Sequence, residues 1–108
     1  MGIKQYDVIL VNLDPTVGRE IKKTRPCVVL TTYEINDLLK TPIIAPMTTK
    51  EHKKIPTRIK TNFQNKSCYI ALDQIKMIDA SRVVKILGKI PKNSIKKIKN
   101  ILDEMLIK

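Results

Sequence analysis

Short apolar runs, each broken by a polar or proline-containing segment, fill most of the chain and restrict it to folds built from short strands. β-branched residues are frequent in these runs, which favours strands over helices. The predicted strands are residues 6–13, 25–33, 41–48, 58–60, 67–73 and 83–90. Residues 36–39 suggest a helical turn. Pro42 and Pro46 fall inside the third strand, so we expect that strand to be bulged or to lie at a sheet edge.

In the C-terminal segment the apolar residues instead repeat with the period of an α-helix. Its apolar residues recur on one helical face, at Ile95, Ile98, Ile101, Leu102, Met105 and Leu106. Pro91 precedes this pattern, and Asn93 or Ser94 is suited to cap the start of the helix. One helix packed on a strongly bent sheet of about five to six strands makes a small α+β domain. A chain of 108 residues has room for one domain, which we place at 1–108.

The charge balance favours a polyanionic partner. Twenty-one basic residues stand against ten acidic ones, for a net charge of +11. Most of the basic residues are lysines, which are also common on ordinary solvated surfaces, so charge alone makes nucleic acid only a modest preference.

Cys27 and Cys68 both lie in apolar runs, with no second cysteine or histidine at ligand spacing. We expect two buried free thiols in a reducing cytosol, no disulfide and no metal site. No apolar run approaches the roughly 20 residues that cross a membrane. The first residues lead directly into the first predicted strand, so we expect no signal peptide and a soluble, cytoplasmic protein.

Several common catalytic motifs are missing from the sequence. It has no GxxxxGKS/T phosphate-binding loop, no GxGxxG and no HExxH. His52, the single histidine, lies among lysines and is best interpreted as a solvated residue. A polar cluster at residues 18–26 remains, in which four basic residues surround Glu20. Either Glu20 pairs weakly with a lysine in a solvated loop, or the cluster binds phosphate and keeps one carboxylate for proton transfer. On charge alone the solvated loop is favoured.

Four segments carry a resemblance to a known family. They are Val11–Glu20 (VNLDPTVGRE), Arg25–Leu30 (RPCVVL), Ala45–Thr49 (APMTT) and Leu72–Ile75 (LDQI). These segments resemble the characteristic blocks of the MazF/PemK toxins, the mRNA interferases, namely DPT-x-G-x-E, RP followed by apolar residues, P-x-T, and DQ. Each block alone is a weak motif. The four together follow the family's order with similar gaps, and the resemblance covers nearly the whole chain.

The resemblance implies an SH3-like β-barrel with a C-terminal α-helix. It also implies a sequence-specific endoribonuclease that cleaves single-stranded RNA without a metal or other cofactor. Such a protein acts as a homodimer and is neutralised by a MazE-like antitoxin protein.

Arg25 and Thr48 match the two positions to which catalysis is assigned in the MazF branch. RNA can cleave itself when a 2′-hydroxyl attacks the adjacent phosphate, so the enzyme must hold that phosphate in line and stabilise its added negative charge. Arginine suits this task because it stays protonated and offers a planar fork of donors. Thr48 can donate its hydroxyl hydrogen. The alternatives are a structural arginine and a strand-end threonine.

Glu20 and Asp73 are less certain members of the site. Glu20 matches the acidic residue of the family's first loop, and Asp73 matches the carboxylate that the PemK branch uses as a base. That branch also has a histidine just before the loop glutamate and an arginine two residues before the aspartate, where this chain has Arg19 and Ala71. The MazF-type assignment is therefore preferred. The proton acceptor is Glu20, Asp73 or water, and Asp73 could equally cap a turn.

Sequence-specific recognition is expected from the loops at residues 14–24 and 49–66, which would bind a few splayed bases. The predicted RNA-binding residues are Arg19, Lys22, Lys23, Thr49, Lys50, Lys53, Lys54 and Gln74.

Two other functions fit the same features. The CcdB toxins share this fold and bind DNA gyrase without enzymatic activity, and a plain basic barrel would bind RNA or DNA through lysines alone. Arg25 and Thr48 favour the ribonuclease, because neither alternative needs that pair.

Overall fold

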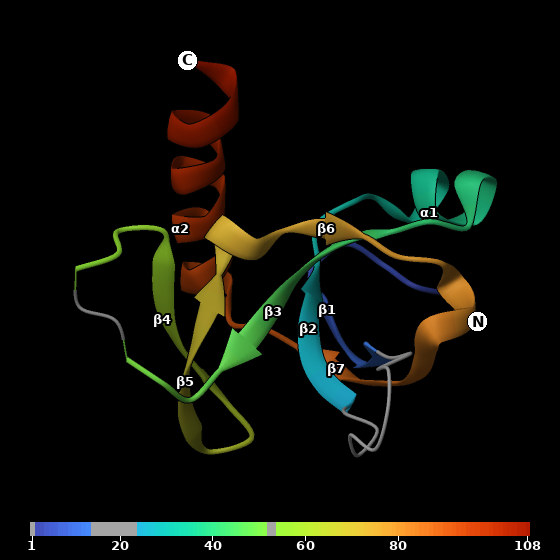
Figure 1. Ribbon diagram of the computed structural model, residues 1–108, viewed down its shortest axis with the longest axis horizontal. Coiled ribbons are helices and arrows are strands. Elements are labelled where there is room, and N and C mark those ends of the chain that lie inside the picture. The colour runs from blue at the N-terminus through green and yellow to red at the C-terminus, as the bar shows by residue number, and fades with distance from the viewer. Residues whose placement is uncertain (1, 14–23, 52–53) are drawn as a thin grey trace, which may run out of the picture.

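The computed structural model describes residues 2–13, 24–51 and 54–108, and its strands form one antiparallel sheet (Figure 1). The strands are β1 (Asp7–Asn12), β2 (Thr24–Val29), β3 (Ile43–Thr48), β4 (Arg58–Phe63), β5 (Lys66–Ala71), β6 (Lys76–Met77) and β7 (Val83–Lys89). The helical elements are α1 (Tyr33–Leu39), α2 (Lys92–Leu102), two 3₁₀ turns (Leu72–Gln74 and Ala80–Arg82) and a π-helical turn (Asp103–Ile107). An α+β domain with a C-terminal helix is thereby confirmed.

The strands follow the order β4-β5-β3-β2-β1-β7, and β6 pairs with β3 beside this path. β6 adds a strand to the expected five or six, because two residues are too few to show an apolar period. β4 and β7 stand at the two ends of the path. No ladder joins them in the part of the chain that the structure describes, so closure of the sheet into a barrel is not seen.

The central strands are buried on both faces. Successive residues of a strand point to opposite sides of a sheet. Val8 and Val28 pack in one apolar cluster together with residues of α2, whereas their neighbours Ile9 and Cys27 pack in a second cluster. Cys27 and Cys68 are both buried free thiols, as expected.

β3 lies in the middle of the sheet and not at an edge, which corrects one of the two expectations for a strand that contains Pro46. On one side of β3, Pro46 faces Cys27 of β2. On the other side, β3 pairs with β6 through residues 43–44 and with β5 through residues 47–48. Pro46 has no N–H to donate, and it falls in the gap between those two ladders, where the sheet tolerates it.

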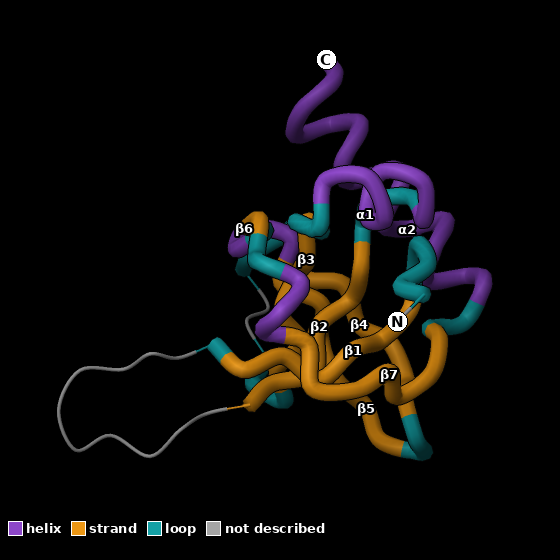
Figure 2. The backbone as a smooth tube through the Cα atoms, turned by 90° about the vertical axis from the view of Figure 1, so that its right-hand side faces the viewer, coloured by secondary structure: helices purple, strands orange, loops and turns teal. Residues whose placement is uncertain are grey.

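α2 packs beside β4, and both helices lie toward the same end of the molecule (Figures 1 and 2). Four of the predicted apolar positions contribute to the core there: Ile95, Ile98, Ile101 and Leu102. Met105 and Leu106 are exposed, contrary to the packing expected from the helical period. They belong to the π-helical turn that follows α2 and extends past the sheet (Figure 1).

The second strand ends at Val29, earlier than predicted, and the helix α1 takes up the end of the predicted segment. The Thr32 hydroxyl accepts a hydrogen bond from the Ile35 backbone N–H at 3.4 Å and so caps this helix. Asn36 is buried in α1 and donates to the Ile3 carbonyl at 3.1 Å. Asn36 also donates to the nearby Thr31 carbonyl at 3.0 Å. Local side-chain-to-backbone bonds of this kind compete with strand extension, which explains the earlier end of β2.

A buried hydroxyl pair connects α2 to β4. The Ser94 and Thr61 hydroxyl oxygens lie 2.6 Å apart, and both residues are buried. Ser94 is therefore not the helix cap that its position suggested. Pro91 occupies the N-cap, without a side-chain hydrogen bond.

We expect Ser94→Ala to lower the free energy of unfolding by about 1–3 kcal/mol, because it leaves the Thr61 hydroxyl buried without a partner. The double variant Thr61→Val/Ser94→Ala removes both polar groups and should recover most of that loss. Urea unfolding of the wild type and the variants measures these differences. A double variant no more stable than Ser94→Ala would show that the loss has another source.

Candidate active site

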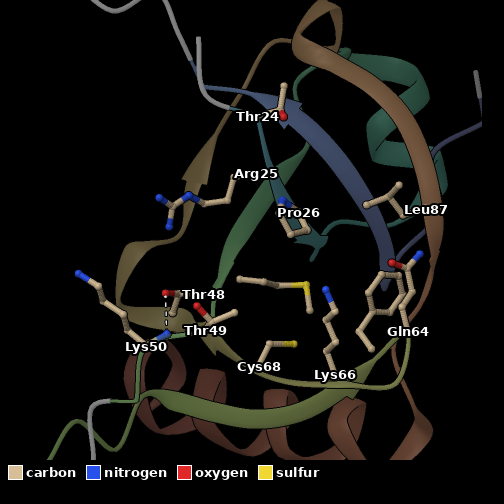
Figure 3. Close-up of a pocket in the computed structure, with 12 residues that line it drawn as sticks. Thr24, Arg25, Pro26, Thr48, Thr49, Lys50, Gln64, Lys66, Cys68 and Leu87 are labelled. Atoms are coloured by element: carbon tan, nitrogen blue, oxygen red, sulfur yellow. Dashed lines mark hydrogen bonds between the residues drawn. The ribbon is translucent and has the colours of Figure 1, made fainter. Parts of the chain in front are cut away.

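A pocket of about 520 Å³ lies where the ends of β2 and β3 meet the β4–β5 hairpin (Figure 3). Its lining residues are Thr24, Arg25, Pro26, Met47, Thr48, Thr49, Lys50, Phe63, Gln64, Lys66, Cys68 and Leu87. The structure thus brings the two residues predicted to be catalytic, Arg25 and Thr48, into one pocket.

The pocket lies where the pairing of β2 with β3 stops. In the described residues this ladder ends at the Cys27–Pro46 pair. The same antiparallel register, continued by two positions, would set Arg25 opposite Thr48, but the two strands are not paired there. Pro26 has no N–H, so this end of the ladder lacks a backbone donor and the strands can separate.

Arg25 lies in β2 opposite Val11 of β1, and it is half-buried. No carboxylate forms an ion pair with its guanidinium in the ranges that the structure describes. Its charge and its fork of donors are thereby available to an anion such as a phosphate.

Thr48 ends β3, and its hydroxyl oxygen accepts a hydrogen bond from the Lys50 backbone N–H at 3.2 Å (Figure 3). This bond uses a lone pair of Oγ1 and leaves the hydroxyl hydrogen free to be donated. Arg25, Thr48 and Lys50 lie on one side of the pocket (Figure 3). This side therefore combines two cations with a hydroxyl donor.

Asp73 is held by an arginine outside the pocket. The Arg58 guanidinium donates two hydrogen bonds to its carboxylate, from Nε to Oδ1 at 2.8 Å and from Nη2 to Oδ2 at 3.1 Å. The Thr57 hydroxyl donates a third, at 3.1 Å. The Arg58 hydrogen bonds hold the pKa of Asp73 below its usual value, although partial burial of the carboxylate acts in the opposite direction.

Comparison with known proteins identifies the family. The model of the PemK-like, MazF-like toxins of type II toxin–antitoxin systems matches residues 4–106. The chain belongs to this family.

Individual MazF proteins are similar to the chain over almost its full length. Endoribonuclease MazF of Staphylococcus saprophyticus is 30% identical over 106 residues, which cover 94% of this chain and 88% of the relative. A MazE–MazF crystal structure from Deinococcus radiodurans gives a TM-score of 0.85 at 20% identity, with 98% of this chain and 96% of the other covered. An endoribonuclease in complex with its cognate antitoxin, from a mycobacterial species, gives 0.79 at 18% identity, with 96% and 94% covered. At 18–20% sequence identity, the similarity to these two structures shows that the chain shares their fold.

The predicted RNA-binding residues of this MazF/PemK toxin are unevenly placed. Thr49 and Lys50 line the pocket, whereas Lys54 and Gln74 are exposed and do not line it. Five predicted site residues and the single histidine lie outside the described residues: Arg19, Glu20, Lys22, Lys23, His52 and Lys53.

The ion pair of Asp73 was missed by the sequence analysis. Where the PemK branch of the family has an arginine, this toxin has Ala71, yet a guanidinium still reaches Asp73. It comes from Arg58, which pairs with Ala71 across the β4–β5 ladder. Arg58 and Asp73 are 15 residues apart, so only the strand register brings them together.

The side of the pocket away from Arg25 was predicted only through the 49–66 segment, in which none of its residues was singled out. Its residues come from the β4–β5 hairpin and from β7: Phe63, Gln64, Lys66 and Leu87. The one available signal was the gap between the strands predicted at 58–60 and 67–73, which is short enough for a hairpin. Nothing in the sequence indicated that this hairpin faces Arg25.

Other chemistries find little support in the described residues. No three His, Cys, Asp or Glu side chains of residues 2–13, 24–51 and 54–108 form a group that could hold a metal. Burial raises the pKa of the Cys27 thiol to about 12, against the opposing charges of Lys76 and Arg25, so this thiol stays protonated. None of the described helices is long and apolar enough to span a membrane.

We expect Asp73→Asn to lower the melting temperature at neutral pH, because Arg58 loses its charged partner. The native pKa of Asp73 is depressed, so the pair stabilises the fold above the unfolded-state pKa of about 4 and stops doing so as the pH falls through the native value. The difference between wild type and variant should therefore shrink below about pH 4. Melting curves over this range measure it, and a difference that does not change with pH would contradict the assignment.

Proposed function

We propose that this chain is an endoribonuclease toxin that cleaves single-stranded RNA at short sequence motifs in the cytoplasm, with Arg25 and Thr48 as its catalytic residues. One observation carries the proposal: the two residues line the same open pocket, and no carboxylate of the described residues forms an ion pair with the arginine. The name of the Staphylococcus relative, Endoribonuclease MazF, supports the same activity.

The proposed reaction takes place within the RNA. The 2′-oxygen attacks the adjacent phosphorus, the O2′–P bond forms and the P–O5′ bond breaks, which leaves a 2′,3′-cyclic phosphate and a 5′-hydroxyl. A base takes the 2′-hydroxyl proton, and the leaving oxygen gains a proton from an acid or from water. Arg25 stabilises the negative charge on the non-bridging oxygens, and the Thr48 hydroxyl holds one of those oxygens for in-line attack. The RNA supplies the nucleophile and Arg25 supplies the charge, so the reaction needs no metal or cofactor.

We assign the proton acceptor to Glu20 or to water. Asp73 is less suited to this role, because Arg58 lowers its pKa and a carboxylate of lowered pKa is a weaker base. Asp73 also does not line the pocket. Glu20, from the family's first loop, lies outside the described residues and remains the candidate.

We infer two protein partners. The MazE–MazF and endoribonuclease–antitoxin complexes among the solved structures of this fold support a MazE-like antitoxin, for which the +11 net charge favours an acidic segment. The second partner is another copy of the chain. Val84 and Ile86 are exposed apolar residues on β7, which ends the strand order, and they are suited to such an interface. RNA would then lie in a groove between protomers, lined by the 14–24 and 49–66 loops.

We expect the pure protein to cut a long single-stranded RNA into discrete fragments in the presence of EDTA. Each upstream fragment should end in a 2′,3′-cyclic phosphate, which mass spectrometry of the fragment ends identifies. Loss of cleavage in EDTA, with recovery on adding magnesium or manganese, would overturn the mechanism. RNA that stays intact under all conditions would instead favour a gyrase-binding toxin or a plain nucleic-acid-binding protein.

We expect Arg25→Ala to slow cleavage on the order of a hundred- to thousandfold, because it removes a preorganised donor to the transition state, typically worth about 3–4 kcal/mol. Thr48→Val keeps the branched shape and deletes the hydroxyl, so cleavage should fall while the fold persists. RNA affinity should change far less, since the other basic residues still attract the backbone.

Lys97→Ala is the matched control for both variants, because Lys97 is exposed on α2, does not line the pocket and is not among the predicted RNA-binding residues. Cleavage rate, RNA affinity and melting temperature are compared for all three variants. Near wild-type cleavage by Arg25→Ala, or a loss explained by unfolding, would show that the catalytic assignment is wrong.

A further inference from the structure

The pocket has a second side that differs in chemistry from the catalytic pair. Figure 3 shows Gln64 and Leu87 on the side opposite Arg25 and Thr48. Figure 3 shows Pro26 and Cys68 between the two sides, and Met47 also contributes apolar lining to the pocket. At about 520 Å³ the pocket has the size of a small-molecule site and is larger than one phosphate group needs. The second side therefore has room for another part of the RNA.

A tight hairpin holds Gln64 at the pocket. β4 and β5 pair without interruption as far as Phe63 and Lys66, so Gln64 and Asn65 alone make the turn. Both have a positive φ, of 52° and 63°, as a type I′ turn requires. Asparagine and glycine adopt this conformation most readily, and glutamine does not. The turn itself therefore gives no reason for a glutamine at position 64, and strained positions of this kind concentrate at functional sites.

The aromatic ring of Phe63, next to Gln64 in the chain, is held in place by its packing. A Cβ atom at Gly88 would lie 3.2 Å from Cε1 and 3.4 Å from Cζ of the Phe63 ring, so the ring packs closely against β7 because residue 88 has no side chain. The ring also packs against the apolar cluster that includes Ile98 of α2. Phe63 is nevertheless only half-buried and lines the pocket, so part of it is available to a ligand.

The Gln64 amide is exposed and lines the pocket, and it has no hydrogen-bond partner in the described ranges of the chain. An amide offers a donor and an acceptor side by side, which is the pattern that pairs with a nucleobase edge. Unstacked RNA bases bind proteins by stacking on aromatic side chains and by hydrogen bonds to their edges. Lys66 lines the same pocket and can attract a neighbouring phosphate.

We propose, on the basis of the ribonuclease function above, that this side of the pocket is a base-specificity subsite. A nucleobase next to the scissile phosphate lies against Phe63, and the Gln64 amide selects it through hydrogen bonds to its edge. Gln64 is thus a specificity-determining residue, distinct from the catalytic pair.

The test compares the wild type with Gln64→Gly and Asn65→Gly. Glycine suits the positive φ at both positions, so neither variant strains the turn, and only the first removes a side chain that lines the pocket. Each protein selects from a random RNA pool with 2′-fluoro in place of the 2′-hydroxyl, which cannot be cleaved, and the bound strands are sequenced. A parallel assay maps the cleavage sites in unmodified RNA.

We expect the wild type to enrich one base at one position of the bound strands, and Gln64→Gly to reduce that enrichment about tenfold. Asn65→Gly should keep the wild-type profile. No enrichment by the wild type, or an unchanged profile for Gln64→Gly, would overturn this inference even if RNA is cleaved. Enrichment that depends on Gln64 without any cleavage would support the subsite and contradict the ribonuclease function.

Discussion

The site depends on how β3 divides its two edges among its neighbours. One edge pairs with β2 as far as Pro46, and the other pairs first with β6 and then with β5. Backbone N–H groups buried in a sheet must find partners, and a proline has none to satisfy. Pro46 can therefore stand where the strand changes partners. Beyond it the pairing of β3 with β2 has ended, while β3 stays paired with β5 through Thr48, and residues of all three strands line the pocket.

The electrostatics of the site depend on which arginine has a carboxylate partner. Arg58 is bound by Asp73, so its charge is largely neutralised and its geometry is fixed. Arg25 has no such partner among the described residues, and its chain neighbours Pro26 and Cys27 provide no negative charge, because the buried thiol stays protonated. The Arg25 guanidinium is half-buried and has no carboxylate partner among the described residues, so its positive charge produces a strong electrostatic field in the pocket. The same residue type thus serves structure in one place and is available to an anion in the other.

The sequence could predict the elements in which apolar residues recur at a regular spacing. Most strands and the face of α2 up to Leu102 follow from the apolar pattern alone. Met105 and Leu106 continue that pattern but extend past the sheet, because the period of a helix does not say where its partner surface ends. Thr32 and Asn36 form local hydrogen bonds where the second strand ends, and the apolar pattern of the sequence does not show such bonds.

The candidate site was predictable only in part for a similar reason. Arg25 and Thr48 lie in blocks that resemble the family, so they could be selected without knowing that both line one pocket. Gln64 and Phe63 lie in no such block. Their placement depends on the length of the β4–β5 ladder and on the missing side chain of Gly88. Contacts of this kind are set by strand pairing between distant segments, which a single sequence does not encode in any local pattern.

Net charge and pocket geometry contribute differently to RNA binding. A charge of +11 attracts any polyanion and does not distinguish one phosphate from the next. To cleave one phosphodiester bond and not its neighbours, an enzyme must hold a base and the phosphate beside it on the same rigid part of the protein. Binding of the base then places that phosphate in line for attack. Strands β2 and β3 carry the phosphate side and the β4–β5 hairpin carries the other, and β5 is hydrogen-bonded directly to β3. In the proposed reaction, base recognition and phosphate positioning would therefore be coupled through one ladder.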